Sequence, residues 1–476
     1  MPDAFRMLSE QDVETIDRAA RRLLEEVGIR VRDEGFRDRL EKAGAETDAA
    51  AQIVRFPAGW LDQTLSQAPS AFTLHARDGA DDVSLGSGRV AFGNGGRVFR
   101  ILDRDGTYRG TTLADVARTA ALVDRLERLR FYIVACHPEN VPAEDEVLNG
   151  FHQALLFTSK HVMGGCDSLA SLEKIRALAV LLAGSEEAFR KAPFLSIITN
   201  PISPLTLDPE TLKMLQYCGT HGIPATCAPA PIAGATAPAT LGGTLSQLHA
   251  EALAGVAVTQ ALVPGAKVLY GAVATAMDLR KMDFTLGSVE GAMMNAAAVQ
   301  LARRYGLPIY ASAGLTEAKE ANFQAGFEKA VSSLMVGMAG ADFIHLAAGM
   351  LDSGNTISLE QYVIDDECLG MVHRVLDGIG TDDDALGVDV VKQVGPGGNF
   401  VMEDHTIDHM MEEFFYPDLM VRSNFDVWDQ GGRPTTLSRA RDKLDDILPG
   451  TPAAKIEPAQ RDEIRKRFPR LLDVTW

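Results

Sequence analysis

The sequence lacks an excess of basic residues and any long apolar run. Its 476 residues include 46 Lys and Arg against 65 Asp and Glu, which gives a formal net charge of −19 at pH 7. Neutralising nucleic-acid phosphates requires basic clusters, so this balance argues against nucleic acid as a partner. No apolar run approaches the roughly 20 residues of a membrane helix, and the charged N-terminus lacks the apolar core of a signal peptide. We therefore expect neither a nucleic-acid nor a membrane partner.

Cysteine is scarce as well, with five residues in the chain and no CxxC pair. An odd and scattered set suits a reducing cytoplasm better than a disulfide framework, so we expect a cytoplasmic protein. The apolar fraction of 46% and the charged fraction of 23% are those of an ordinary globular chain. The length is sufficient for one large domain with attachments.

From about residue 112 the chain alternates between apolar runs and helical patterns. The runs are almost continuously apolar, which is typical of parallel strands covered on both faces. They lie at 130–136, 161–166, 194–199, 224–229, 267–274, 308–314 and 342–349. The helical patterns lie at 144–158, 170–184, 208–221, 244–262, 287–304, 322–339 and 359–378. Seven such units predict a (β/α)8 TIM-type barrel, because the edge strands of an open sheet would look more polar.

Both ends of the chain are expected to extend this barrel. Residues 1–110 indicate an N-terminal helical and β-hairpin element packed on the barrel, and residues 111–405 indicate the barrel catalytic domain. Residues 406–476 indicate a C-terminal helical extension. The eighth strand has three candidate positions: 387–394, 399–404 and the β-rich part of the N-terminal element.

Few residues with obvious chemistry follow the expected strands, where a barrel of this kind places its active site. The sequence has no Ser–His–Asp order, no GxGxxG and no Walker loop. The stretch "GNGGR" (93–97) is interpreted as a hairpin turn, since no helix follows it to bind a phosphate. The four acids of "EQYVIDDE" (360–367) cannot all share one helix face and are interpreted mainly as solvated. His345 and Tyr310 lie in apolar runs, where packing in the core is the ordinary role.

A zinc–thiolate site has to be weighed, because Cys136, Cys166 and Cys227 end or follow three of the expected strands. Zinc requires three or four convergent ligands, usually with one local pair. No two cysteines are neighbours here, and a buried cysteine is a common small core residue. We expect no metal site.

Several stretches together resemble the trimethylamine methyltransferase superfamily. They are "GGRVFRILDRDGTYRGTTLADVART" (95–119), the block from "NFQAGFEK" to "EQYVIDDE" (322–367), "VGPGGNF" (394–400), "HT" (405–406) and "W…GG" (428–432). The resemblance covers about residues 10–450, and the block 322–367 is its most specific part. It implies a (β/α)8 barrel that passes a methyl group from an amine to a cognate corrinoid protein.

The founding members of that family carry pyrrolysine in the loop after the sixth strand, where this chain has "AGLTEAK" (313–319). The chain therefore resembles the branch without pyrrolysine, whose characterised members demethylate quaternary amines such as glycine betaine. A quaternary ammonium leaves as a neutral tertiary amine without taking up a proton, and cob(I)alamin is itself the nucleophile. The resemblance thus implies no catalytic side chain and no permanently bound cofactor.

Such a site needs aromatic rings around the cation and, for a betaine, donors for its carboxylate. The candidates for the aromatic cage are Tyr310, Phe92, Phe323 and Phe400, and those for the carboxylate are His345, Arg97 and Lys319. The corrinoid protein is expected to dock at the barrel mouth, and the chain is expected to form a homo-oligomer. Two alternatives stay open: a zinc-dependent betaine–thiol methyltransferase and a non-catalytic betaine-binding barrel.

Overall fold

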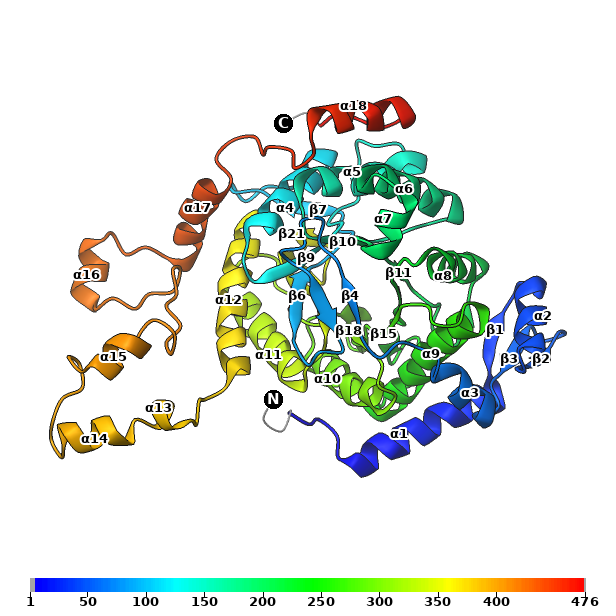
Figure 1. The fold of residues 1–476 in the computed structure, drawn as a ribbon, viewed down its shortest axis with the longest axis horizontal. Helices are drawn as coiled ribbons and strands as arrows, with labels where there is room; N and C mark the ends of the chain where they lie inside the picture. Colours follow the sequence, from blue (N-terminus) through cyan, green and yellow to red (C-terminus); the bar gives the residue numbers. More distant parts are fainter. Residues whose placement is uncertain (1–4, 475–476) are drawn as a thin grey trace.

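The computed structural model describes residues 5–474, which form a closed barrel of eight parallel strands surrounded by helices (Figure 1). Residues 1–4 of the expected N-terminal element and residues 475–476 of the expected extension lie outside the described residues. The barrel strands are β6 (Ala91–Asn94), β9 (Leu129–Ile133), β10 (His161–Gly165), β11 (Leu195–Thr199), β13 (Ala225–Cys227), β15 (Val268–Ala272), β18 (Ile309–Ser312) and β19 (Phe343–Ala348). The expected (β/α)8 barrel and its seven apolar strands are confirmed.

The eighth strand is β6, which pairs with β19 on one side and β9 on the other. It comes from the N-terminal element, so the barrel begins upstream of residue 111. The other two candidate positions are wrong, because 388–394 is helical and 399–404 contains no strand. The interpretation of "GNGGR" as a hairpin turn is also wrong: these residues end β6 and lead into the mouth of the barrel. Their glycines serve close packing, since a Cβ on Gly93 would lie 2.0 Å from the Phe131 ring and one on Gly95 would lie 1.8 Å from Met350 Sδ.

One long helix follows each barrel strand and covers the outside of the sheet. In chain order these are α4 (Leu113–Arg125), α5 (Ala143–Phe157), α6 (Leu169–Ala183), α8 (Pro209–His221), α9 (Leu241–Leu262), α10 (Val289–Arg304), α11 (Phe323–Ala339) and α12 (Leu359–Asp377), with the short α7 (Glu186–Lys191) after α6. Local sequence fixes their ends. In α8, for example, Asp208 caps the first turn, Pro209 occupies the first helical position and Gly222 ends the helix in the left-handed conformation.

The N-terminal element covers one side of the barrel. The helix α1 (Glu10–Arg22) continues into the π-helical turn η1 (Leu23–Val27), which ends at Gly28, and α1 packs on α9 and α10. A four-stranded sheet follows, made of β1 (Ile29–Val31), β3 (Ile53–Arg55), β2 (Glu46–Asp48) and β12 (Thr206–Leu207), together with α2 (Glu34–Lys42) and α3 (Ala58–Leu65).

A hairpin of β4 (Phe72–Leu74) and β5 (Val83–Leu85) closes the N-terminal end of the barrel. Its side chains Leu74, Val83 and Leu85 are buried in one cluster with Phe131 and Phe343, which line the barrel interior. The opposite end, where the strands terminate, is therefore the open end.

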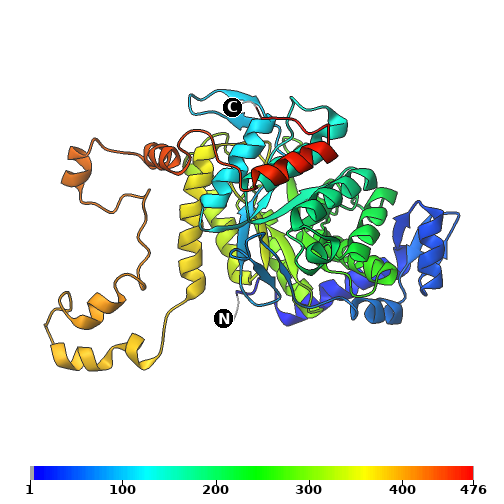
Figure 2. The same cartoon turned by 45° about the horizontal axis from the view of Figure 1, so that its top comes forward.

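After α12 the chain leaves the barrel and forms what we call the arm, residues 378–435. The arm contains the short helices α13 (Asp383–Leu386), α14 (Val388–Val394), α15 (Asp404–His409) and α16 (Phe425–Gln430). Figures 1 and 2 show it extending from one side of the molecule before the chain returns. The helix α17 (Thr436–Ile447) then packs on α12, and α18 (Pro458–Arg467) packs on α6. Among the described residues, no helix is long and apolar enough to cross a membrane.

The acids of "EQYVIDDE" are not solvated, contrary to the interpretation from sequence. Asp365 pairs with Lys329 inside the protein, and Glu367 accepts backbone N–H groups from residues 418–420. Asp366 accepts the Arg128 N–H, and Glu360 accepts from Ser358 and pairs with Arg441. Each acid holds a different segment to α12, so they need not share one face.

Candidate functional site

The open end of the barrel is built from the loops that follow the strands. The loops after β6 and β19 combine into a small sheet of β7 (Arg100–Leu102), β8 (Tyr108–Gly110), β20 (Met350–Leu351) and β21 (Thr356–Ile357). The loops after β13 and β15 form a second sheet of β14 (Ile232–Ala233), β16 (Thr275–Asp278) and β17 (Asp283–Thr285). This end is where barrels of this type carry their active sites.

Backbone strain gathers at the same end. Six non-glycine residues of the strand ends and loops there have positive φ: Arg97 at 61°, Leu205 at 50°, Met282 at 60°, Leu346 at 66°, Asp352 at 54° and Ser353 at 50°. Such conformations are uncommon outside glycine and persist only where surrounding structure enforces them, often at functional sites. Leu346 also lies within an irregularity of the β19–β6 pairing, immediately after His345. The strain therefore marks the strand ends that carry Arg97 and His345.

An aromatic stack runs along the barrel interior towards the mouth. The rings of Phe131 and Phe343 stack at 3.5 Å between centroids, Tyr310 stacks on Phe343 at 5.4 Å, and His345 stacks on Tyr310 at 4.0 Å. In the strand register Tyr310 lies opposite Phe343 and Ser312 opposite His345, so His345 is the member nearest the mouth. The structure thus brings two of the candidate site residues, Tyr310 and His345, into direct contact.

Burial keeps the ring of His345 neutral. Its side chain is almost inaccessible, and desolvation lowers its pKa well below the usual value. The Nε2 atom lies 2.6 Å from Ser312 Oγ, which fixes the ring plane. Burial likewise raises the pKa of Tyr310, so the phenol also stays neutral. The stack is therefore a buried aromatic column without formal charge, with His345 at its mouth end.

A polar cluster lies at the same end of the barrel, after β6 and β9. Arg97 Nε donates to His137 Nε2 at 2.8 Å, and the Nδ1 of His137 is hydrogen-bonded to Glu146. The Phe99 ring stacks on His137 at 4.8 Å. Because His137 Nε2 accepts from Arg97, its Nδ1 carries the proton and donates to the Glu146 carboxylate. The guanidinium of Arg97, whose side chain is 40% exposed, is thereby held at the rim.

Sequence reasoning identified Arg97 but missed Glu146 and Phe99. Phe99 follows Arg97 by two residues in "RVFR", which was a usable signal. Glu146 stands in a run of three acids at the start of α5, and no local pattern distinguishes it from Glu144 and Asp145.

The polar side chains of the loop after β18 are bonded to neighbouring segments of the chain. Thr316 Oγ1 donates to Glu328 at 2.6 Å, and Glu317 accepts from Gly287 N at 2.9 Å and from the Ser353 hydroxyl. Lys319 forms an ion pair with Asp352, which also pairs with Arg100 at 2.8 Å. The polar groups of this loop therefore join neighbouring loops to one another, and the Lys319 ammonium already has a carboxylate partner.

A buried ion pair supports the ends of β18 and β19 from behind. Lys329 Nζ of α11 donates to Gly314 O at 2.7 Å and to Asp365 Oδ2 of α12 at 3.0 Å. The same carboxylate accepts from Gly349 N and Gln361 Nε2, each at 2.8 Å. Burial raises the pKa of Asp365, while these three donors oppose that rise. The pair connects two helices to the backbone beside the mouth.

The structure separates the remaining candidates from this site. Phe92 is fully buried on the outer face of β6, where its ring meets His373 edge-on at 5.2 Å. Phe323 is 86% exposed at the start of α11 and stacks on Phe327. Phe400 lies on the arm and is 40% exposed. An apolar residue in a strand or loop gives no sequence signal of the face on which it lies, which is why these three could not be told from Tyr310.

The cysteines do not converge either. Cys136 and Cys227 are buried, and burial raises the pKa of the Cys166 thiol to about 12. Thiolate is the form that binds zinc, so protonated thiols at separate strand ends are poor ligands. Among the described residues, the only group arranged to hold a metal ion contains no cysteine.

Comparisons with known proteins agree with this architecture. The family model described as trimethylamine methyltransferase (MTTB) matches residues 2–470. The glycine betaine methyltransferase of Desulfitobacterium hafniense (strain Y51) is 30% identical over 461 residues, which cover 97% of this chain and 95% of that protein. The trimethylamine methyltransferase MttB of Desulfitobacterium hafniense (strain DSM 10664 / DCB-2) is 31% identical, with 92% and 88% covered.

Among solved structures, the monomethylamine methyltransferase MtmB of Methanosarcina barkeri superposes with a TM-score of 0.54. It is 13% identical, and the match covers 93% of this chain and 89% of that one. At this identity the likeness concerns the fold alone. The family model and the curated relatives, which span almost the whole chain, show that this protein is a methyltransferase of the trimethylamine methyltransferase family.

Proposed function

We propose that the protein transfers a methyl group from a quaternary amine, with glycine betaine as the leading substrate, to the Co(I) of a corrinoid carried by a partner protein. The observation that carries the proposal is the neutral, buried stack of His345 on Tyr310 at the base of the mouth. A quaternary ammonium is attracted by uncharged aromatic faces and would be repelled by an imidazolium. A relative named for glycine betaine supports this choice of substrate.

The proposed reaction requires no acid, base or nucleophile from the chain's own side chains. The bond between nitrogen and the methyl carbon breaks, its electron pair remains on nitrogen, and the product leaves as dimethylglycine with an uncharged nitrogen and its carboxylate intact. The corrinoid, a substrate brought by its partner, supplies the electron pair for the new bond to the methyl carbon. No proton is needed on the leaving group, so the mouth needs no general acid. The protein binds and orients the amine and excludes water.

Arg97 is our first candidate for the carboxylate of a betaine. His137, Glu146 and Phe99 fix its guanidinium at the rim, and a planar guanidinium suits a carboxylate. Lys319 ranks second, because a substrate carboxylate would have to compete with Asp352 for its ammonium group. No proton is taken from or given to the substrate by either residue.

The rim of the mouth also suits a protein partner. Large apolar side chains are exposed on the loops after three strands, β6, β11 and β15: Phe99 by 57%, Ile202 by 54%, Met282 by 68%, Phe284 by 41% and Tyr108 by 45%. Exposed aromatic and Met side chains gathered at one place are typical of binding surfaces. We propose that the corrinoid protein docks here and presents its cofactor to the mouth.

The test is a methyl-transfer assay with reduced cob(I)alamin, first free and then on a corrinoid protein encoded nearby. The panel contains glycine betaine, other quaternary amines and trimethylamine, and the visible spectrum reports methylcobalamin. We expect conversion with one quaternary amine and none with trimethylamine. Conversion with trimethylamine alone would refute the quaternary substrate. Failure with every amine on both acceptors would favour a non-catalytic betaine-binding barrel, and conversion of a thiol acceptor would favour the thiol methyltransferase.

A further inference from the structure

The helices in the first part of the arm have no core of their own. In α13, α14 and α15, which have four, seven and six residues, no residue is buried. Helices this short are unstable alone, and most helical stability in proteins comes from packing. Small units without a core are commonly held by a metal ion or by association. Something other than apolar packing within the single chain must therefore position these helices.

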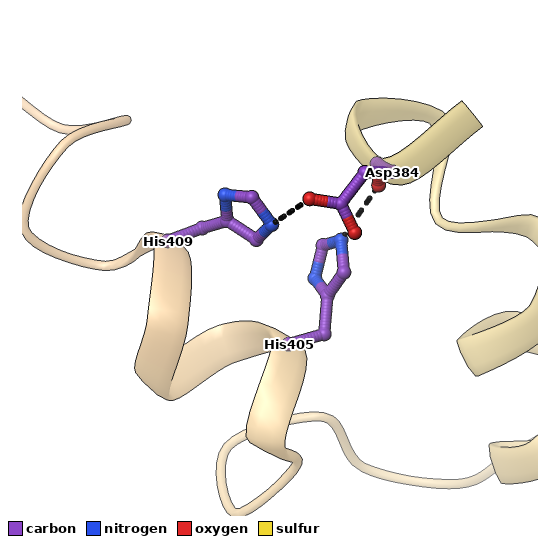
Figure 3. Close-up of side chains that lie close together, drawn as sticks. All are labelled: Asp384, His405 and His409. Carbon is purple, nitrogen blue, oxygen red and sulfur yellow. Dashed lines mark hydrogen bonds and ion pairs between the residues drawn. The ribbon is translucent and has the colours of Figure 1, made fainter. Parts of the chain in front are cut away.

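Three side chains that bind metal ions converge where α13 meets α15. His405 and His409 are four residues apart on α15, so their rings project from one face of the helix, and Asp384 of α13 lies opposite (Figure 3). His409 Nε2 lies 3.1 Å from Asp384 Oδ2, His405 Nε2 lies 2.9 Å from Asp384 O, and the two ring centroids are 4.4 Å apart. One nitrogen of each ring and one carboxylate oxygen all lie within 4.8 Å of one another.

A glycine, Gly387, lies beside this cluster. A Cβ added to Gly387 would lie 3.4 Å from His405 Nε2, in van der Waals contact, and Gly387 has a φ of +57°. Glycine at this position lets the chain turn between α13 and α14 while His405 approaches the backbone. The close approach of His405 thus depends on the turn that presents Asp384.

We propose that Asp384, His405 and His409 bind one divalent transition-metal ion of the zinc class, which fastens α15 to α13. Two imidazoles and a carboxylate are a common zinc ligand set, and a histidine pair in the spacing HxxxH on a helix is its usual local element. Calcium and magnesium prefer sets of oxygen ligands, so two imidazoles select against them. Zinc binds such ligands at about 2.0–2.2 Å. Small side-chain rotations would bring the three atoms to that range.

The ion's role would be structural. The site lies in the arm, outside the barrel and away from the aromatic stack (Figure 1), so it takes no part in the proposed methyl transfer. It would close the segment from Asp384 to His405, which includes α14 and the glycine-rich stretch "VGPGGNF". Metal binding in such a unit contributes directly to its folding. Zinc binding in the arm and methyl transfer at the mouth can therefore be tested separately, and the absence of one would not contradict the other.

The experiment uses the full chain without a histidine tag, stripped with EDTA and titrated with Zn²⁺ against a chromophoric competitor at pH 7.5. We expect one zinc per chain for the wild type and a loss of that zinc in the double variant H405A/H409A. His221→Ala is the matched control, because that histidine lies at the end of α8 against Tyr217, far from the arm in sequence. It should keep the full zinc content.

A second readout reports the structural role. Limited proteolysis should cut within residues 378–435 several-fold more slowly with zinc than without it, in the wild type and the H221A control only. Unchanged circular dichroism would show that the double variant keeps its barrel, and His409→Gln provides a milder replacement. The proposal is overturned if the wild type binds no zinc at micromolar concentration, or if the double variant binds as much as the wild type.

Discussion

For single residues, the proposed binding of a cation depends on the charge of His345. The ring is stacked on Tyr310 and held by Ser312, and burial keeps it neutral. Replacing His345 by Leu keeps an apolar side chain of similar size but removes the aromatic face. A desolvated cation–π contact contributes about 2 kcal/mol, so we expect the KM for the quaternary amine to rise by roughly 30-fold.

Kinetics with a panel of variants would check this role. Tyr310→Phe preserves the ring beneath His345 and should leave KM within about twofold, whereas Phe323→Ala removes an exposed ring outside the site and should change nothing. A KM that stays at the wild-type value in His345→Leu would show that the cation binds elsewhere in the mouth. Thermal melting of each variant separates a binding defect from a folding defect.

A second histidine, His161 of β10, predicts how stability depends on pH. Burial lowers its pKa to about 4, and its ring donates from Nδ1 to His75 O and accepts at Nε2 from Ser196 Oγ. Unfolded histidine has a pKa of about 6.5, so the unfolded chain binds the proton first as the pH falls. The contribution of His161 is therefore complete above pH 6.5 and is lost progressively down to about pH 4. Between pH 7 and pH 5 it amounts to about 2 kcal/mol.

His161→Gln keeps a donor and an acceptor but cannot titrate. We expect the difference in the free energy of unfolding between pH 7 and pH 5 to be about 2 kcal/mol smaller in this variant than in the wild type. Urea denaturation followed by fluorescence at the two pH values measures it. An equal difference in both proteins would show that His161 is not the titrating group.

For secondary-structure elements, the Lys329–Asp365 pair explains how two outer helices determine the shape of the mouth. It holds α11 and α12 to Gly314 and Gly349, at the ends of the strands that carry Tyr310 and His345. Lys329→Met would leave the Asp365 carboxylate buried without its cation, a change that typically costs about 3–5 kcal/mol. Replacing both residues, as K329M/D365L, removes the unpaired charge and should recover part of that stability.

Chemical denaturation of the single and double variants gives the coupling between the two side chains. Lys392→Met, which breaks an exposed pair with Asp389 on α14, is the control and should have no measurable effect. If the loss in K329M/D365L equalled the sum of the losses in K329M and in D365L, the two charges would not interact. Activity should fall in both, because Gly314 and Gly349 lose their common anchor.

At this scale the sequence also shows what patterns can and cannot predict. Seven strands and their helices were predictable because strands covered on both faces are apolar throughout. The eighth, β6, contains "AFGN" and ends in glycines that serve packing against Phe131 and Met350, so local rules indicated a turn. Similarly, the burial of the acids of α12 and the outward direction of Phe92 depend on partners that are distant in sequence, so local patterns do not predict them. The pair His405 and His409, by contrast, stands in the sequence as HxxxH, a local pattern that an expectation based on the cysteines does not include.

For the whole molecule, the arm carries an apolar surface that a single copy of the chain leaves exposed. Fifteen large apolar side chains between Ile379 and Val427 are at least 40% exposed, among them Met402, Met411, Phe414 and Phe425. An apolar surface of this extent marks an interaction site. The arm lies on the flank of the barrel, beside α12, whereas the corrinoid partner is proposed to dock at the mouth (Figure 2). We therefore expect second copies of the chain to cover it.

A charge placed in the arm should break that association without harming the barrel. Met411→Glu and Phe414→Asp each replace a side chain that is at least 60% exposed in the single chain, so neither removes a contact within the core. Met282→Glu, with an equally exposed apolar side chain on the mouth rim, is the control for added charge. Size-exclusion chromatography with light scattering should give an oligomer for the wild type and M282E, and a monomer for M411E and F414D.

The M282E chain should instead lose methyl transfer to the corrinoid protein while keeping transfer to free cob(I)alamin. An arm variant that remains oligomeric, or a wild type that is monomeric at micromolar concentration, would mean that the apolar side chains of the arm serve a different partner.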